Sequence, residues 1–270
     1  MLYNAKNGRL DISGATMDYI KFGSGNKNLI MIPGLGDGLK TVKGLALPMA
    51  AMYREFAKDF TVWVFSRKQP LEDNATTRTM AADLKQAMDM PGIEKGCILG
   101  VSQGGMIAQW LAVDRPQKVE KLVLAVTMAW QNDTVQSVVG SWIYMAEKGS
   151  WKLFITDNFE KSYSESYLKK YRPLYPVIVP FMKPADSRRF LIQARACLTH
   201  NAMEYIENIS APTLIIAGEQ DKIVTADASV QMAKKISGSR LIVYRSYGHA
   251  VYEEAAGFNS RVKEFFLQYI

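Results

Sequence analysis

The sequence predicts an α/β protein with a mostly parallel central sheet, helices on both faces and an inserted helical cap. Short, strongly apolar runs alternate with segments that repeat apolar residues at helical spacing. This alternation is typical of parallel strands joined by crossover helices. It stops between residues 130 and 205, where helical patterns and prolines follow one another without a convincing strand. We interpret that stretch as the inserted cap.

The apolar runs locate the strands, because a continuous run bounded by turn residues indicates a buried strand. Two opening strands are expected at 2–4 and 17–22, with an antiparallel start, and six more at 28–32, 61–65, 97–99, 122–126, 213–217 and 241–244. Helices are expected between and after them, at 77–88, 106–113, 226–236 and 260–269.

The domain prediction is one core made of residues 1–129 and 206–270, with residues 130–205 inserted as a cap. A chain of 270 residues, 48% of them hydrophobic, can bury one sizeable core and a subsidiary element. The cap is rich in aromatic residues, which either pack the cap itself or line an apolar pocket over the end of the sheet. The candidate pocket residues are Trp130, Trp142 and His200.

Composition narrows the functional classes. The net charge is +7, but lysines and arginines are scattered along the chain, which favours a slightly basic surface over a nucleic-acid-binding one. No stretch approaches the roughly 20 apolar residues that cross a bilayer, and the beginning of the chain lacks a signal-peptide pattern. We therefore expect a cytoplasmic protein with a small-molecule substrate, and neither a membrane nor a nucleic acid as partner.

Cysteines and glycine-rich segments give no sign of a cofactor. Cys97 and Cys197 lie in apolar surroundings, which favours two buried thiols over a disulfide or a metal site. The glycines at 34, 36 and 38 lack the spacing of a dinucleotide-binding motif, and no phosphate-binding motif or metal-ligand cluster is present in the sequence. We expect no cofactor and no metal.

The strongest chemical signal is the segment 100–105, which reads Gly-Val-Ser-Gln-Gly-Gly between a predicted strand and a predicted helix. A nucleophile on a tight turn needs neighbours without side chains, because larger residues would clash, and Gly100 and Gly104 meet that need. The helix that follows points its free amides and the positive end of its dipole at the turn, which favours an anion there. Ser102 is the predicted nucleophile.

In this context the segment resembles the nucleophile turn of the α/β-hydrolase superfamily, and the resemblance covers essentially the whole chain. The order and spacing are most similar to small capped esterases, lactonases and carbon–carbon bond hydrolases of the enol-lactone hydrolase type. In that family an acid after a late strand and a histidine near the C-terminus follow the serine in chain order. The resemblance implies the α/β-hydrolase fold and an enzyme with a serine, acid and histidine triad.

The histidine that matches this order is His249, one of only two in the chain, which follows Gly248 after the last predicted strand. Imidazole, with a reference pKa of about 6.5, can accept the serine proton at neutral pH. The other, His200, lies in the segment that returns from the cap, where related lactonases often carry His-Asp and this chain has Asn201. We expect His200 to be structural or to line the pocket.

The acid must hold the imidazole in the tautomer whose free nitrogen faces the serine. The predicted strand 213–217 is followed by Gly-Glu-Gln and then Asp221, which matches the family's strand, glycine, short spacer and aspartate. Asp221 is therefore the predicted acid. The alternatives are Glu219, which is close to the strand end, and Asp227, which begins or lies within the next helix.

The oxyanion of a tetrahedral intermediate needs two donors. The resemblance assigns them to the backbone amides of Gln103 and of Leu35, in the loop Pro-Gly-Leu-Gly-Asp-Gly at 33–38. Pro33 departs from the histidine that many relatives carry, which leaves the detailed geometry of this loop open. Arg67 is what remains of the family's Asp-x-Arg-Gly pattern, and we expect it to bind loop carbonyls or a nearby carboxylate.

The predicted reaction is acyl transfer to water through an acyl-enzyme on Ser102. The expected substrate is a small carboxylic ester, lactone or thioester with an apolar acyl group. Three alternatives stay open: a carbon–carbon bond hydrolase with the same triad, an acyltransferase or perhydrolase, and a non-enzymatic ligand receptor on a hydrolase scaffold. A dehalogenase is disfavoured, because it would need aspartate at position 102.

Overall fold

The computed structural model describes residues 2–184 and 186–268. The centre of the structure is one eight-stranded sheet in the order β1-β2-β4-β3-β5-β6-β7-β8. Every strand except β2 runs in the same direction. The strands are β1 (Lys6–Ile12), β2 (Ala15–Phe22), β3 (Lys27–Ile32), β4 (Phe60–Phe65), β5 (Gly96–Val101), β6 (Val119–Ala125), β7 (Thr213–Gly218) and β8 (Arg240–Tyr244). The predicted mostly parallel sheet with an antiparallel start is confirmed.

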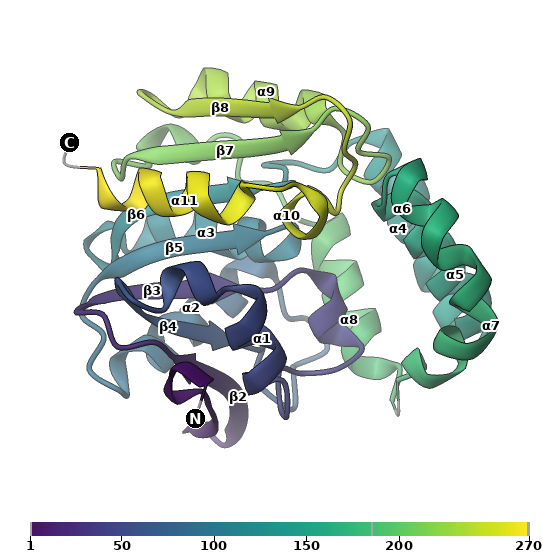
Figure 1. Ribbon diagram of the computed structural model, residues 1–270, viewed down its shortest axis with the longest axis horizontal. Coiled ribbons are helices and arrows are strands. Elements are labelled where there is room, and N and C mark those ends of the chain that lie inside the picture. The colour runs from purple at the N-terminus through teal and green to yellow at the C-terminus, as the bar shows by residue number, and fades with distance from the viewer. Residues whose placement is uncertain (1, 185, 269–270) are drawn as a thin grey trace.

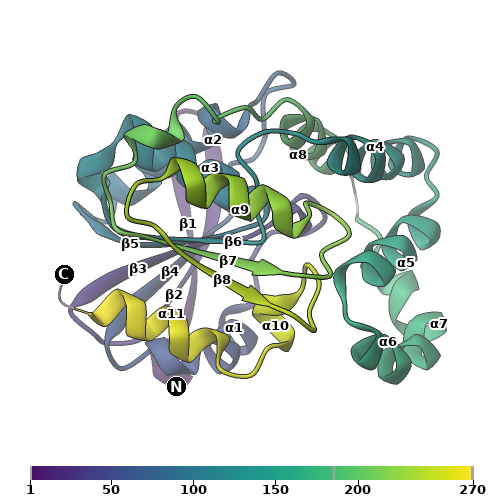
Figure 2. The same cartoon turned by 90° about the horizontal axis from the view of Figure 1, so that it is seen from above.

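Helices cover both faces of the sheet (Figure 2). On one face lie α2 (Thr77–Asp89), α3 (Gln103–Asp114) and α9 (Ala226–Lys235); on the other lie α1 (Ala46–Met52), α10 (Val251–Glu254) and α11 (Phe258–Leu267). Successive strand residues pack into opposite layers: Ile30 joins the α2 and α3 side, while Leu29 and Met31 join the α1 and α11 side. Because both faces are buried there, central strands such as β4, β5 and β7 are almost entirely apolar rather than alternating.

A run of helices between β6 and β7 interrupts the strand–helix alternation. These are α4 (Asp133–Glu147), α5 (Trp151–Ser162), α6 (Glu165–Tyr171), α7 (Tyr175–Ile178) and α8 (Arg188–Leu198), together called the helical insertion below. They lie beyond the carboxyl ends of the parallel strands (Figures 1 and 2). Asn132 begins α4 by accepting the amide of Val135 at 2.9 Å, a cap that stabilises a helix by about 1 kcal/mol.

Aromatic side chains hold the helical insertion together. Trp142 and Trp151 each pack edge-to-face on Phe154, and Trp151 and Phe154 pack in the same way on Phe190 of α8. The same buried cluster includes Met106 and Met128 of the sheet domain, and Leu35 packs against it. The aromatic excess seen in the sequence therefore serves the packing of the insertion, and the apolar cluster it forms reaches the edge of the sheet.

The prediction was wrong at the start of the chain. Residues Leu2–Asn4 form a 3₁₀ turn, in which Tyr3 and Asn4 have φ angles of 48° and 58°. The opening strand is instead β1. Most of its residues are polar and exposed, so it gives no apolar run. Helix α1 was not predicted, because only Ala46 and Ala50 mark its buried face. The end of the predicted helix at 260–269, Tyr269, lies outside the described residues.

Both cysteines are buried and free, as predicted. Burial raises the pKa of the Cys97 thiol and of the Cys197 thiol to about 12, so both stay protonated and unreactive at neutral pH. No helix among the described residues is long and apolar enough to span a bilayer.

Candidate active site

Ser102 occupies the turn between β5 and α3, with φ 53° and ψ −121°. A positive φ at a non-glycine residue lowers the stability of the fold by on the order of 1–3 kcal/mol, and residues strained in this way cluster at functional sites. A Cβ at Gly104 would lie 1.9 Å from the carbonyl oxygen of Ile32, and one at Gly100 would lie 2.6 Å from that of Gly104. Thr127 Oγ1 donates to the Ser102 carbonyl at 2.7 Å. The two glycines are thus required for the turn, as the sequence indicated.

His249 lies between Ser102 and Asp221. Its Nε2 is 2.9 Å from Ser102 Oγ, and its Nδ1 is 2.8 Å from Asp221 Oδ2. The other oxygen of Asp221 accepts the amides of Ile223 at 2.8 Å and Val224 at 3.0 Å. These bonds fix the carboxylate, so that Nδ1–H can donate to it and Nε2 is free to accept the serine proton.

The alternative acids lie elsewhere. The side chain of Glu219 is exposed just after β7. The backbone amide of Glu219 donates to the carbonyl of Tyr244 at 3.0 Å. Asp227 is exposed in the first turn of α9. The structure therefore brings Asp221, and neither Glu219 nor Asp227, to His249.

The two segments that carry the candidate oxyanion donors meet at Ser102. Leu35 begins the 3₁₀ segment Leu35–Gly38 and Gln103 begins α3. The amide at the first position of a helical segment has no partner within that segment. A Cβ at Gly34 would lie 3.3 Å from Ser102 Cβ, which places the loop directly against the serine. Both amides are thus in segments that can present them to an anion formed at Ser102.

The helical insertion holds the loop that carries His249. The amide of Ala250 donates to the carbonyl of Ser162 at 2.8 Å. The amide of Ser164 donates to Glu254 Oε1 at 3.0 Å, and its hydroxyl donates to Glu254 Oε2 at 2.5 Å. Because these contacts come from the turn between α5 and α6, the position of that turn and the position of His249 are linked.

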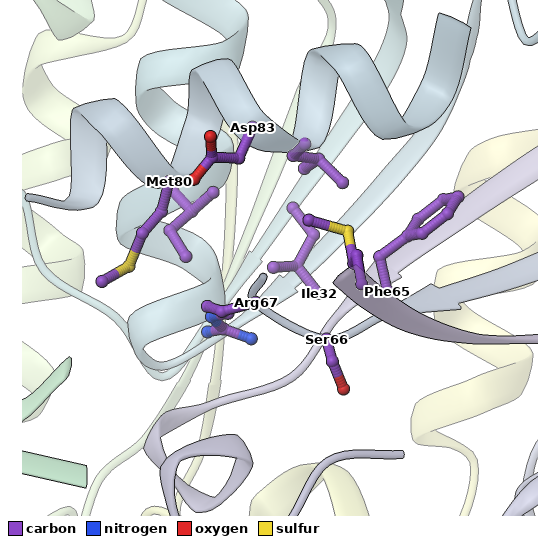
Figure 3. A pocket seen from close by; sticks show the side chains of 9 residues that line it. Ile32, Phe65, Ser66, Arg67, Met80 and Asp83 are labelled. Atoms are coloured by element: carbon purple, nitrogen blue, oxygen red, sulfur yellow. The ribbon is translucent and has the colours of Figure 1, made fainter. Parts of the chain in front are cut away.

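Arg67 follows β4 and is buried beside the candidate oxyanion loop. Its Nη2 donates to the carbonyl of Pro33 and, at 2.9 Å, to Gln103 Oε1. Figure 3 shows Arg67 at a small cavity that is also lined by Asp83 and Met80 of α2. The candidate catalytic residues are not among those lining this cavity in the described structure. Arg67 thus binds a loop carbonyl, as the sequence predicted.

The three candidate pocket residues have other contacts. Trp142 is buried in the helical insertion, where its Nε1 donates to Asp157 Oδ2 at 2.7 Å. Trp130 pairs with Asn201 through an isolated β-bridge and packs against the core cluster on the α2 and α3 face. Neither these contacts nor those of His200 include Ser102. A pocket role remains a prediction for Trp130 and for Trp142, whose apolar cluster extends to Leu35.

His200 has the contacts of a structural residue. It is 2% exposed, its Nδ1 is 2.8 Å from Thr77 Oγ1, and its ring packs edge-on against Trp110. These partners belong to α2 and α3 and lie in the core. Of the two roles that the sequence left open, the contacts favour the structural one.

Burial of His200 should make stability depend on pH. Burial lowers its pKa to about 3, against about 6.5 for an exposed histidine. Between these values the unfolded chain binds a proton that the folded chain does not, so stability falls as pH drops, by up to about 1.4 kcal/mol per pH unit. In urea unfolding from pH 7 to pH 4.5, we expect His200→Gln to show a shallower decline than the wild type. Identical declines would contradict this role.

Comparison with known proteins identifies the family. The family model described as alpha/beta hydrolase fold matches residues 27–256. The chain therefore belongs to the α/β-hydrolase family and is an enzyme of the hydrolase class. The family resemblance predicted from the sequence is confirmed. Within the described residues, no group of three or more histidine, cysteine, aspartate or glutamate side chains is placed to hold a metal ion.

Individual relatives are similar over almost the whole chain. The 2-hydroxy-6-oxononadienedioate/2-hydroxy-6-oxononatrienedioate hydrolase 2 of Pseudomonas putida is 26% identical over 289 residues, which cover 96% of this chain and 93% of the relative. An α/β-hydrolase enzyme from a Medee basin deep-sea metagenome library has a TM-score of 0.86 at 20% identity, covering 97% and 98% of the two chains. The enol-lactonase of Burkholderia xenovorans LB400 has a TM-score of 0.84 at 19% identity, covering 97% and 100%.

Proposed function

We propose that this protein is a serine hydrolase that cleaves a small carboxylic ester, lactone or thioester through an acyl-enzyme on Ser102. The observation that carries the proposal is the pair of contacts of His249, 2.9 Å to Ser102 Oγ and 2.8 Å to Asp221 Oδ2. Serine is a weak nucleophile until a base takes its proton, and a base is useful only when a third group orients it. Both conditions are met by these three side chains.

The proposed reaction has two halves. His249 removes the proton from Ser102 Oγ, which attacks the substrate carbonyl, and the amides of Leu35 and Gln103 donate to the resulting oxyanion. His249 then returns the proton to the leaving group, which departs and leaves the acyl group on Ser102. In the second half the same imidazole deprotonates a water molecule, whose oxygen attacks the acyl carbonyl; the bond to Ser102 Oγ then breaks, the imidazolium returns the proton to Oγ, and the acid is released. Asp221 stabilises the imidazolium formed in each half.

The paired arginines of the helical insertion favour an uncharged acyl group. The residues 130–205 contain four arginines, and each pairs with a carboxylate of the chain itself. These pairs join Arg172 to Glu160 and Glu165, Arg188 to Asp73, Arg189 to Asp37, and Arg195 to Glu147. An arginine engaged in this way is less available to bind a substrate carboxylate. The apolar cluster that reaches Leu35 is instead suited to hydrocarbon.

If the insertion acts as a cap over Ser102, longer acyl chains should react better. Each methylene that becomes buried in the transition state should contribute up to about 0.8 kcal/mol until the site is full. We expect kcat/KM to rise along p-nitrophenyl acetate, butyrate and hexanoate, and to level off or fall once the site is full. A flat series would show that the aromatic residues of the insertion serve only its own packing.

A second candidate function is carbon–carbon bond hydrolysis. The Pseudomonas putida relative is named as a hydrolase of 2-hydroxy-6-oxononadienedioate, and the same triad would serve that chemistry. A dienoic diketone with two carboxylates, assayed beside the ester, lactone and thioester panel, separates the two candidates. A kcat/KM for the diketone far above that of every ester would put the second candidate first.

The same panel addresses the remaining alternatives. An acyltransferase or perhydrolase would react faster when an alcohol or hydrogen peroxide is added, and a ligand receptor would turn over no substrate. The cytoplasmic location and the apolar small-molecule substrate inferred from the sequence remain part of the proposal.

A further inference from the structure

A buried arginine joins the two segments that carry the candidate oxyanion donors. One nitrogen of Arg67, Nη2, donates both to the carbonyl of Pro33 and to Gln103 Oε1. Pro33 lies two residues before Leu35, and Gln103 carries the second candidate donor itself. Because one atom binds both segments, Arg67 sets how far apart they are.

A buried carboxylate in the oxyanion loop is held by the same arginine and by the helical insertion. The side chain of Asp37 has 0% exposure and pairs with Arg189 of α8, whose own side chain is 13% exposed. Asp37 Oδ2 accepts the amide of Arg67 at 3.1 Å and Nε2 of Gln193 at 3.3 Å. Arg189 Nε also donates to the Asp37 carbonyl at 3.0 Å. The loop is thus bound to α8 through both its backbone and its side chain.

Helix α8 also binds the nucleophile turn. Gln103 Nε2 donates to the carbonyl of Gln193 at 2.7 Å and to Cys197 Sγ at 3.2 Å. In addition, Arg189 Nη1 donates to the carbonyl of Lys68 at 2.9 Å. The oxyanion loop, the segment after β4, the nucleophile turn and α8 are therefore joined by one network of buried and part-buried hydrogen bonds.

Such a network suits a site that stabilises an oxyanion. Donors contribute most when they are already aimed at the anion before it forms, at about 2.7–3.1 Å from its position. A buried, hydrogen-bonded network resists displacement, because breaking one bond leaves a polar group unpaired at low dielectric. Pro33 brings no backbone N–H to this network, and its carbonyl accepts from Arg67.

We propose that Arg67, Asp37 and Arg189 are positioning residues that set the spacing of the amides of Leu35 and Gln103. Docking of α8 on the oxyanion loop then completes the oxyanion hole, and the insertion contributes to the chemical step as well as to substrate binding. This inference rests on the proposed serine-hydrolase function. It assigns to Arg189 an effect on kcat, which a residue that only covers the bound substrate would not have.

The chain offers a matched control in the neighbouring residue. Arg188 lies on the same helix and also pairs with an aspartate, Asp73, but those two side chains are 58% and 78% exposed. With p-nitrophenyl butyrate, Arg189→Gln should lower kcat by roughly 10-fold to 100-fold, since a small misplacement of catalytic groups can cost about 100-fold. KM should change by less than about threefold, because ground-state contacts remain. Arg188→Gln should leave both constants unchanged.

Two further readouts separate positioning from general destabilisation. In the first readout, active sites are counted by complete labelling with a fluorophosphonate, and rates are expressed per active site. In the second, the Ki of an alkyl boronic acid is measured for each variant, because this inhibitor forms a tetrahedral adduct with the serine. In Arg189→Gln the Ki should rise in parallel with the loss of kcat/KM. A lowered Tm with wild-type kcat per site and wild-type Ki would overturn the inference and leave Arg189 a purely structural residue.

A milder variant covers the case in which Arg189→Gln does not fold. Arg189→Lys keeps the charge but loses the paired N–H groups that bind Asp37. It should lower kcat by about tenfold, with the same parallel rise in Ki. Wild-type constants in this variant would overturn the inference. Failure of the proposed function would look different, because Ser102→Ala would then retain activity.

Discussion

Replacement of Ser102 by alanine should lower kcat for p-nitrophenyl butyrate by about 10³-fold or more, because the attacking oxygen is removed. The fold should persist, since the flanking strand and helix hold the turn at its φ angle of 53° and alanine adds no atom. Steady-state kinetics, together with circular dichroism and Tm, check both halves of this expectation.

The residual rate of this variant is also informative. Amides aimed at the oxyanion still stabilise a transition state in which water attacks directly, so a small activity above background is expected. Retention of most of the wild-type activity, in contrast, would remove Ser102 from the mechanism.

Asp221→Asn should be the second most damaging change, with a fall in kcat of up to about 10⁴-fold. An asparagine whose amide nitrogen faces His249 Nδ1 would stabilise the tautomer that carries its proton on Nε2, and that nitrogen could no longer accept the serine proton. The amides of Ile223 and Val224, which bind Asp221 Oδ1, should keep the substituted side chain in place.

Two matched variants serve as controls for this change. Glu219→Gln and Asp227→Asn alter exposed carboxylates near the same strand and helix, and each should change kcat by less than about tenfold. Steady-state kinetics on the three variants provide the comparison. If Asp227→Asn proved the most damaging, the assignment of the acid would be wrong.

The sequence predicted the sheet well where strands are buried on both faces. After one polar residue each, Asn28 and Thr213, the runs 28–32 and 213–217 are apolar because helices cover both sides, and they were located within one residue of β3 and β7. Strand β1 was not predicted, because it is an exposed edge strand whose residues are largely polar. Strand signals come from apolar runs: β8, at the other edge of the sheet, was located because residues 241–244 are apolar, although none of them is fully buried.

The three residues His249, Asp221 and Ser102 could be selected from the sequence because local patterns mark them. Each follows a strand and stands beside or near a glycine, so a short window contains the signal. Their mutual distances of 2.8 and 2.9 Å depend on the order of strands in the sheet, which the family resemblance implied and the structure shows.

The network around Arg67 could not be predicted in this way. Asp37 and Arg189 are 152 residues apart, and no local pattern distinguishes Arg189 from Arg188. The sequence indicated only that Arg67 would bind a carbonyl or a carboxylate. Arg189 turns toward the loop with 13% exposure and Arg188 turns outward with 58%, a difference that arises only when the helix packs on the loop.

The relatives and the helical insertion point to different substrates. The Pseudomonas putida relative is named for a dicarboxylate substrate, whereas the arginines of the insertion pair with carboxylates of this chain. At 26% identity the substrate for which this relative is named does not carry over to this chain. The substrate panel is therefore the experiment that assigns the reaction.

Stoichiometric labelling with a fluorophosphonate, followed by peptide mapping, tests the role of Ser102 most directly. We expect one adduct per chain, located on Ser102, with activity lost in proportion to labelling and no labelling of Ser102→Ala. Complete labelling of Ser102 with activity retained, or complete inactivation with the label on another residue, would contradict an acyl-enzyme at Ser102.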